Sequence, residues 1–374
     1  MFALLRLDKL KILFICQIVK NNTNGVWKKV EAQVKALRKI YRSVDFVYLK
    51  DTKTAVFDTG VSQSEIQLIN KYQIFSKIIT IISDDYNVVY LRKPHGGLFP
   101  VTAAYFIKKI KKKNKSINVL LEIPTYPYKF ESKGVIGWIK EKIFEISIYT
   151  VKNDINEILY IGEATDNILG ITARAMGNGV DLNKVSRIET RKNCEPFVFL
   201  GIANLMFWHG YDRLINSLGK YKGNKEIIFY IIGDTEPEFS RLQILVEKLK
   251  LEKRVIFLGK KNKDEINELL EKTNVCVDAL GRHRSGNNVN DSLKSKEYSA
   301  MGIPFIKSHI DYSLGTPFFV YQISSDESDI DLDKIIDWYI HLPTDMNKKI
   351  RMYAENNFSW ELIMKKAISG DGQS

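Results

Sequence analysis

A lysine and a glutamate one helical turn apart stand just before a well-marked helix end. Lys294 and Glu297 are i,i+3 neighbours, so both side chains project from one face of the expected helix. Gly302 has the position of a C-cap, Pro304 prevents continuation, and residues 305–306 begin an apolar strand. A carboxylate can accept hydrogen bonds from a ribose diol, and an ammonium can neutralise a diphosphate. The pattern indicates a nucleotide site, although a solvated Lys/Glu pair on a surface helix has the same spacing.

Strand and helix patterns alternate along both halves of the chain, which predicts parallel, doubly wound sheets. In the first half we expect strands at 10–18, 44–49, 87–91 and 117–122 and helices at 26–40, 64–78 and 99–112. Residues 129–165 are expected to be mainly helical with a strand near 146–150. In the second half strands are expected at 197–200, 227–232, 255–258 and 275–279. The ligand site of such folds lies at the carboxyl edge of the sheet.

The motif Lys-x-x-Glu-Tyr-x-Ala-x-Gly-x-Pro over residues 294–304 resembles the nucleotide-binding signature of retaining glycosyltransferases of the GT-B fold, in particular family 4 and its group 1 relatives. Further matches occur in the family's order at 178–181, Gly201, 208–214, 231–234, 254–259 and 357–361. The resemblance covers most of the C-terminal half. It implies an α/β fold of two Rossmann-like doubly wound domains facing a central cleft. These are an acceptor domain at 1–185, a nucleotide-sugar domain at 186–355, and a C-terminal helix at 356–374 packing back on the first domain.

The resemblance also implies where the donor binds. Glu297 would contact the ribose, Lys294 and arginines the diphosphate, and residues 259–262 the base. His209 stands where many relatives have lysine, and Ala203 where they commonly have arginine. The donor-binding residues implied in this way are Gly25, Gly201, His209, Arg213, Gly259, Arg282, Lys294 and Glu297.

One carboxylate of the family's pair is missing. Relatives carry two glutamates eight residues apart, and Val289 occupies the first position. The loop 281–291 offers backbone N–H groups, His283, Arg284 and Asp291 in its place. We therefore expect His283 and Arg284 to join the catalytic residues.

Three loops of the first half follow expected strands and carry polar groups. Asn24 and Gly25 begin a helix, where backbone N–H groups can face an anion. They resemble the glycine-bearing first loop of the family, which implies that Gly25 approaches the donor's phosphates and Asn24 the acceptor. Arg92 and His95 follow another strand and are expected to bind the acceptor, Arg92 as a planar fork on phosphate. Ordinary strand-to-helix turns have the same composition.

The third of these loops follows the strand at 117–122. Glu122, Thr125 and Tyr126 are stiffened by two prolines, and we expect Glu122 and Tyr126 to be catalytic and Thr125 to bind the acceptor. A strand-end salt bridge is the alternative for Glu122.

The net charge of +12 lies entirely in the first half. Residues 1–185 contain 29 Lys and Arg against 17 Asp and Glu, and the remainder contains 27 against 27. Six lysines fall within 108–115, and an amphipathic helix with Trp138 is expected at 134–149. Both features are typical of a protein that binds an anionic membrane surface. The alternative for the lysines is a solvated helix end, and the alternative for 134–149 is a helix that covers a core.

Length and composition limit the remaining possibilities. At 374 residues two domains are expected, and no apolar run is long enough to span a bilayer. Cys16, Cys194 and Cys276 lie far apart, so we expect reduced thiols in a cytoplasmic protein. The five histidines are not grouped, so we expect no protein-bound metal. The basic first half leads us to expect the protein at the inner face of the membrane.

The resulting interpretation is a metal-independent glycosyltransferase without a bound cofactor. Its donor is a nucleotide diphosphate sugar, with UDP favoured, and its acceptor is a polyisoprenoid-diphosphate-linked glycan of capsule or exopolysaccharide synthesis. Other GT-B enzymes, namely a phosphorylase or a sugar-nucleotide epimerase, are alternatives. A basic nucleic-acid-binding protein that uses 108–115 is an alternative of a different class, but the aromatic interleaving of a stacking surface is missing, so we expect no nucleic-acid partner.

Overall fold

The computed structural model describes residues 9–22, 24–128, 134–189, 195–286 and 288–370. The chain divides into two compact units, Met1–Gly177 with Trp360–Ser374, and Asn178–Ser359. The division therefore lies ahead of the expected boundary at residue 185. No helix of the described residues is long and apolar enough to cross a membrane.

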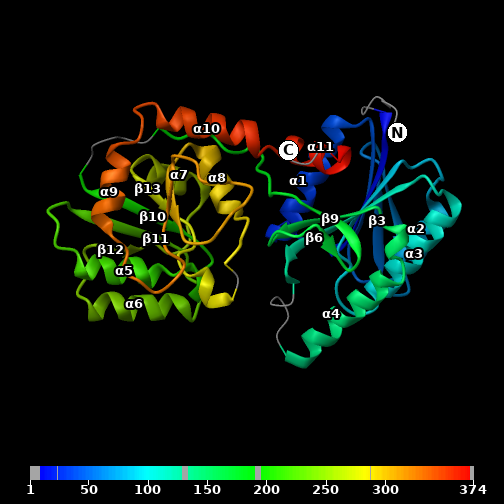
Figure 1. Cartoon of the computed structure of the whole chain (residues 1–374), viewed down its shortest axis with the longest axis horizontal. Coiled ribbons are helices and arrows are strands. Elements are labelled where there is room, and N and C mark those ends of the chain that lie inside the picture. The colour runs from blue at the N-terminus through cyan, green and yellow to red at the C-terminus, as the bar shows by residue number, and fades with distance from the viewer. Residues whose placement is uncertain (1–8, 23, 129–133, 190–194, 287, 371–374) are drawn as a thin grey trace. The chain divides into compact units, whose positions relative to one another are not determined.

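The first unit is a nine-stranded sheet with helices on both faces (Figure 1). In spatial order the strands are β4 (Gln63–Gln67), β3 (Thr54–Asp58), β2 (Ser43–Leu49), β1 (Lys11–Val19), β5 (Val88–Arg92), β6 (Asn118–Tyr126), β7 (Glu157–Gly162), β9 (Ile171–Ala175) and β8 (Asn167–Ile168). The pairs from β2 through β9 are parallel, while β3, β4 and β8 form antiparallel edges.

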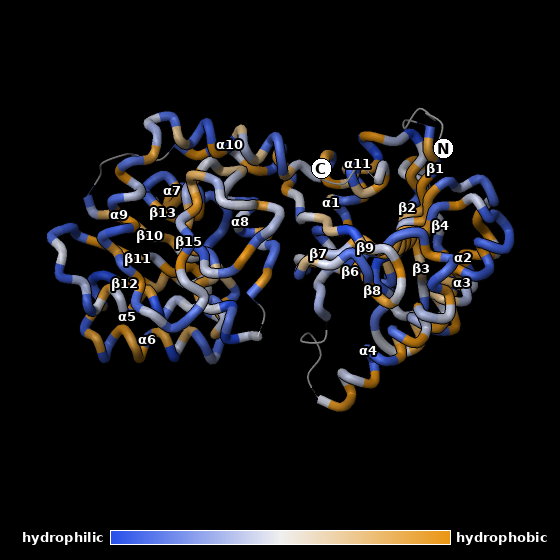
Figure 2. Tube along the Cα trace, viewed as in Figure 1, coloured by the Kyte–Doolittle hydropathy of each residue, from blue (hydrophilic) through white to orange (hydrophobic). Residues whose placement is uncertain are grey.

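Two apolar layers hold the helices to this sheet. One layer packs α2 (Ile74–Ile81), α3 (Phe99–Lys113) and α4 (Gly134–Tyr149) on one face, and the other packs α1 (Gly25–Ile40) and α11 (Trp360–Ser369) on the opposite face. Continuous apolar strands such as β1 are buried on both faces, as is usual for parallel sheets, and Figure 2 shows them as hydrophobic stretches.

Helix α11 joins the first unit although it ends the chain. Arg174 donates from Nη1 to the carbonyl of Lys366 at 3.1 Å and from Nη2 to that of Ala367 at 3.2 Å. Lys39 of α1 lies 2.5 Å from Glu361, and Trp360 is buried against the same layer. These contacts attach the last helix to α1 and β9.

Three expectations about secondary structure are wrong. The region 129–165 was expected to be mainly helical, but α4 ends at Tyr149 and strand β7 follows at Glu157–Gly162. A helix was expected over 64–78, but β4 forms a hairpin with β3 there and helix begins only at Ile74. The turn at Gly60, with φ of +84°, and the bond from Thr59 N–H to the carbonyl of Ser62 favour the hairpin. The strand expected at 146–150 is the end of α4.

The second unit is a six-stranded, wholly parallel sheet. Its order is β12 (Val255–Phe257), β11 (Ile227–Ile232), β10 (Phe197–Ile202), β13 (Val275–Val277), β14 (Phe305–Lys307) and β15 (Val320–Gln322). The helices are α5 (Tyr211–Lys220), α6 (Glu238–Lys248), α7 (Lys263–Glu271), α8 (Leu293–Met301), α9 (Leu332–Ile340) and α10 (Met346–Asn357). One apolar core unites them.

The signature helix α8 is bounded by local chemistry. The Ser292 side chain caps its first turn by accepting from the N–H of Ser295, and Gly302 ends it in the left-handed conformation. A Cβ on Gly302 would lie 2.5 Å from the carbonyl oxygen of Asn347, so only glycine fits. Buried Cys16 and Cys276 are free thiols in β1 and β13, and Cys194 lies outside the described residues.

Candidate functional site

Polar side chains meet at the carboxyl ends of three neighbouring strands in the second unit. β10, β13 and β14 are adjacent and parallel, so the loops that follow them lie at one edge. His209 follows β10, Asp278 follows β13 and His309 follows β14. Lys294 of α8 joins them, with Nζ 3.1 Å from Oδ1 of Asp278. The edge therefore combines a buried carboxylate, an ammonium and two imidazoles.

Asp278 is fully buried yet ionised. Burial alone would raise its pKa, but the Lys294 charge opposes this, together with hydrogen bonds from Ser292 and Ser295, and holds the pKa well below its ordinary value. Ser295 Oγ donates to Oδ2 at 2.7 Å. The carboxylate therefore fixes the end of the Lys294 side chain beside the sheet edge.

Two cations lie at this edge. Nζ of Lys294 is inaccessible to solvent and is held by the ion pair with Asp278. Nε of Arg282 is also inaccessible and makes no hydrogen bond within the described part of the chain, and the guanidinium lies 6.0 Å from the centre of the Trp208 ring. A buried donor is normally satisfied, so Arg282 marks a place where an anion can bind beside Lys294.

His209 contributes no positive charge. Burial and the neighbouring Lys294 charge lower its pKa to about 3. The N–H of Met206 donates to its Nδ1 at 3.1 Å, which requires that nitrogen to be an acceptor. Near neutral pH His209 is thus a neutral donor through Nε2.

His309 is fully buried, and neither ring nitrogen has a hydrogen bond among the described residues. Burial lowers its pKa to about 4, so the folded protein keeps it neutral while an unfolded chain protonates it near pH 6.5. The unfolded state therefore binds more protons between these values, and stability should fall as pH falls from 6.5 towards 4.

We predict that His309→Asn removes part of this pH dependence. At pH 5 the wild type should have lost about 2 kcal/mol of stability relative to neutral pH through His309 alone. Urea unfolding at pH 7 and pH 5 measures the difference for both proteins, and an unchanged slope in the variant would contradict the assignment.

Other arginines of the second unit are occupied by the protein itself. Buried Arg213 donates to the carbonyls of Leu280 at 2.5 Å, Ser324 at 3.0 Å and Ser328 at 3.0 Å. Arg284 makes a bidentate pair with Asp212, at 2.8 and 3.0 Å, and a second with Glu327 at 2.7 and 2.6 Å. Both guanidiniums tie loops together in this conformation.

In the loop expected to replace the missing glutamate, the acidic residue Asp291 is bound by other residues of the second unit. Asp291 accepts from the N–H of Asn178 at 3.0 Å and lies 3.7 Å from Nζ of fully buried Lys296. Lys296 is held more closely by Asp311, at 2.9 Å, and by Ser313. Burial raises the pKa of Asp291, which shares one lysine with Asp311. This cluster secures the start of the second unit.

In the first unit, Glu122 is the centre of a buried charge cluster. Oε1 lies 2.8 Å from Nη1 of Arg92 and 3.2 Å from Nζ of Lys29, and Oε2 accepts from Tyr90 at 2.8 Å and Gln33 at 3.0 Å. Although burial opposes ionisation, these partners lower the pKa of Glu122 to about 2. The carboxylate is fully buried, so here it positions Arg92 and Lys29.

A second cluster follows β5. Buried Lys93 lies 2.9 Å from Oε2 of Glu141 in α4 and 3.8 Å from the centre of the Tyr128 ring. His95, which is partly exposed, lies 3.4 Å from the other oxygen of Glu141. The loop after β5 and helix α4 are therefore joined by a buried ion pair.

Comparison with known proteins identifies a family domain and the fold of this chain. Residues 183–280 match the family model described as glycosyl transferases group 1. No curated protein sequence matches the chain. Solved structures do: a glycosyltransferase from Rickettsia africae ESF-5 has 15% identity and a TM-score of 0.65 over 97% of each chain.

Two further structures are similar. Anabaena Alr3699/HepE in complex with UDP has 14% identity and a TM-score of 0.62, with 96% of this chain and 99% of that chain covered. Sucrose-phosphate synthase from Thermosynechococcus elongatus has 13% identity and a TM-score of 0.61, covering 96% and 97%. The chain carries a group 1 glycosyltransferase domain on a GT-B fold. The family match assigns it transferase activity.

Within this glycosyltransferase, the predicted donor residues fall into two groups. His209, Arg282 and Lys294 come together around Asp278, and Glu297 is exposed one turn after Lys294 on α8. Arg213 lies in the loop network described above. Gly201 packs against Tyr211, whose ring would lie 2.7 Å from an added Cβ, and Gly259 has open space and a φ of +64°.

The remaining predicted residues of the glycosyltransferase lie elsewhere. His283 contacts Glu327 at 2.6 Å, beside Arg284. Asn24 caps α1 by accepting from Val26 N–H at 2.7 Å, and a side chain on Gly25 would meet nothing within 4 Å. Thr125 and Tyr126 are partly exposed at the end of β6.

Sequence reasoning missed Asp278 and His309. Asp278 is the only charged residue in the apolar run 275–280, and that break at the end of an expected strand was an available signal. His309 follows its strand in the same way. Neither position belongs to the motif through which the resemblance was found.

Proposed function

We propose that this glycosyltransferase moves a hexose-type sugar from a UDP-sugar to a polyisoprenoid-diphosphate-linked glycan, with retention of anomeric configuration. Its place of action would be the cytoplasmic face of the membrane, in capsule or exopolysaccharide synthesis. Retention and the acceptor class rest on the resemblance of residues 294–304, and the membrane on the positive charge of the first half.

The observation that supports the donor site is the pair of cations at one sheet edge, Lys294 held by Asp278 at 3.1 Å and Arg282 with a buried Nε that makes no hydrogen bond within the described residues. In a site that excludes water, fixed cations stabilise the charge that develops on a departing diphosphate. Asp278 positions Lys294, and neutral His209 can donate a hydrogen bond to a phosphate oxygen. Glu297, one turn along α8, would accept from the ribose hydroxyls.

UDP is favoured as the donor's nucleotide because a similar fold, that of Anabaena Alr3699/HepE, was solved in complex with UDP. The acceptor would be bound by the first unit. Arg92, held by Glu122, and His95, beside Glu141, are its proposed phosphate contacts, with Thr125 and Tyr126 at the end of β6.

A thermal-shift panel tests the donor assignment. UDP at a hundred times its dissociation constant should stabilise the wild type by about 2.7 kcal/mol, and GDP should do so less. Glu297→Ala should weaken UDP binding by about tenfold or more, because a ribose hydrogen bond to a carboxylate is lost.

Glu252→Ala provides the matched control, since Glu252 is an exposed carboxylate elsewhere in the same unit. Equal UDP shifts in all three proteins would remove Glu297 from the site. No shift with any nucleoside diphosphate at millimolar concentration would reject the nucleotide-sugar proposal.

A further inference from the structure

Helix α4 presents an apolar stripe to solvent. Val135, Trp138, Ile139, Ile146 and Tyr149 are between 45 and 74% exposed, and at 3.6 residues per turn they lie within an arc of about 100°. The same arc contains Lys142, which pairs with Glu145 at 2.6 Å. The opposite side of the helix packs Phe144 and Ile148 into the core. Figure 2 shows hydrophobic residues recurring along this helix. A helix that is apolar towards both core and solvent needs a partner for its outer face.

Helix α3 continues this surface and adds charge. Leu98, Val101 and Tyr105 are exposed on its first half, and Lys108, Lys109 and Lys112 are exposed on its second half. All six side chains lie within an arc of about 100° around the helix. The solvent face of α3 is therefore apolar at one end and basic at the other.

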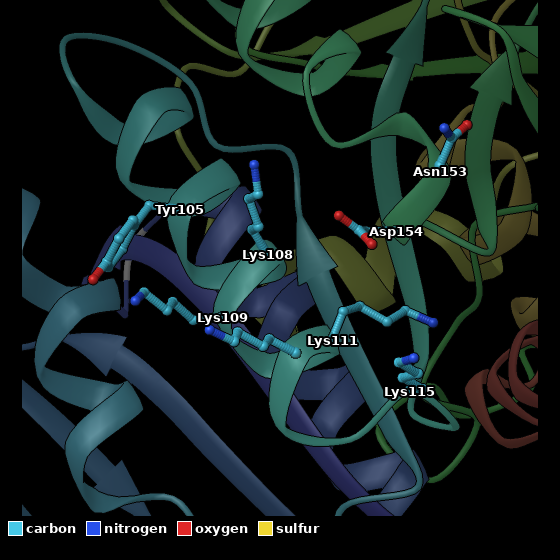
Figure 3. Close-up of a pocket in the computed structure, with 8 residues that line it drawn as sticks. Tyr105, Lys108, Lys109, Lys111, Lys115, Asn153 and Asp154 are labelled. Atoms are coloured by element: carbon cyan, nitrogen blue, oxygen red, sulfur yellow. The ribbon is translucent and has the colours of Figure 1, made fainter.

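The two helices are neighbours on one face of the sheet. Both pack into the apolar layer that also holds α2, and Figure 1 draws them side by side. At the basic end of α3 a hollow of about 800 Å³ opens between the helix and residues Asn153 and Asp154 (Figure 3). Its walls carry five lysines, namely Lys108, Lys109, Lys111, Lys112 and Lys115.

Most of these lysines form no ion pair with an acidic side chain of the described residues. Lys111 is used internally, donating to the carbonyl of Ile117 at 2.7 Å and to Asn156 at 2.9 Å. Within the described ranges, by contrast, Lys108, Lys112 and Lys115 form no ion pair. The acidic groups nearby are Asp154 in the hollow and Asp84, which lies 3.3 Å from Lys113. The local charge is clearly positive.

We infer that the outer face of α3 and α4, which we call the α3–α4 face, docks on an anionic phospholipid surface. The apolar stripe and Trp138 would enter the headgroup boundary, while Lys108, Lys112 and Lys115 attract lipid phosphates. The inference rests on the proposed function only in naming its membrane partner, because the exposure and charge of the face are independent of the donor site.

The basic end of this face is separate from the proposed sugar chemistry. α3 starts after the carboxyl end of β5 and runs back, so its lysines lie towards the amino edge of the sheet. Arg92, His95 and Glu122 lie at the carboxyl edge. The lysine hollow is therefore a contact for the membrane rather than part of the acceptor site. An apolar protein partner would not explain why the lysines continue the stripe.

Flotation with vesicles tests the inference. The full chain should bind vesicles of phosphatidylcholine mixed with phosphatidylglycerol and bind phosphatidylcholine alone far more weakly. Replacing Lys108, Lys112 and Lys115 together by alanine should reduce binding to the anionic vesicles about a hundredfold, since each lysine contributes about fivefold. Trp138→Ser with Ile146→Ser should reduce it at least tenfold.

Control variants remove the same number of lysine charges, and one exposed isoleucine, elsewhere. Lys222, Lys253 and Lys272 are exposed lysines of the second unit, and Ile244 of α6 is 65% exposed. Their replacement, by alanine and by serine respectively, should leave vesicle binding within about twofold of the wild type. Brominated lipid should quench Trp138 fluorescence, and Trp138→Phe should lose most of that quenching.

Three outcomes would overturn the inference. The first is equal binding to neutral and anionic vesicles, and the second is an equal loss of binding in the lysine variant and its control. The third is a wild-type chain that does not bind vesicles but forms a dimer, when the Trp138→Ser, Ile146→Ser variant is monomeric. The last would assign the face to a second copy of the chain. UDP thermal shifts on the same variants should match the wild type, so failure of docking is distinguishable from failure of the donor site.

Discussion

Replacing Glu122 with glutamine should destabilise the protein by about 3–5 kcal/mol, because two buried cations lose their counter-ion. Lys29 and Arg92 both contact Oε1, at 3.2 and 2.8 Å, and both are nearly inaccessible to solvent. Glutamine has almost the same shape, so the loss reports charge rather than packing. Urea unfolding at pH 7 measures it.

The wild type should also lose this contribution in acid. The folded pKa of Glu122 is about 2 against an ordinary value of 4.5, so the stability it provides is complete above about pH 4.5 and decreases as pH falls towards 2. Glu122→Gln should lack that part of the dependence. Glu65→Gln is the control, since Glu65 pairs with Lys50 at the surface and should change stability by less than about 1 kcal/mol.

The same variant separates a catalytic role from a positioning role. If Glu122 acted directly on the acceptor, Glu122→Gln would retain its stability and lose turnover. A stable variant with normal pH dependence would therefore contradict the role derived from the buried cluster.

Lys294→Met should weaken UDP binding by about 10- to 100-fold, the range for one charge-assisted hydrogen bond to phosphate. It should also destabilise the protein by about 3 kcal/mol or more, because fully buried Asp278 loses its closest cation. Calorimetric titration with UDP and urea unfolding measure the two effects separately.

A double variant distinguishes these effects. Lys294→Met with Asp278→Asn removes both charges, so stability should largely return while UDP binding stays weak. Lys334→Met removes an exposed lysine that pairs with Asp331 at 3.1 Å and should change neither quantity. Recovery of UDP binding in the double variant would show that Lys294 does not contact the diphosphate.

Local sequence determined much of this protein. The cap at Ser292, the left-handed end at Gly302 and the strand after Pro304 depend on neighbours within a few residues, so the signature helix could be read directly. Alternation of apolar strands with amphipathic helices predicted both parallel sheets for the same reason. The predictions failed at 64–78 and 146–150, where an exposed edge strand and a helix end that is apolar on both its buried and exposed sides have ambiguous periodicity.

Only the tertiary structure decided which charged residues are already bound by other groups of the protein. Arg213 and Arg284 looked as suitable for a phosphate as Arg282, but packing brings backbone carbonyls to the first, and Asp212 and Glu327 to the second. Burial likewise placed Glu122 with Lys29, far away in the sequence, and made Asp278 the partner of Lys294. Strand order determines which of these distant residues come together at the sheet edge. The free energy of a charge also depends on how deeply the fold buries it, and local sequence does not specify that depth.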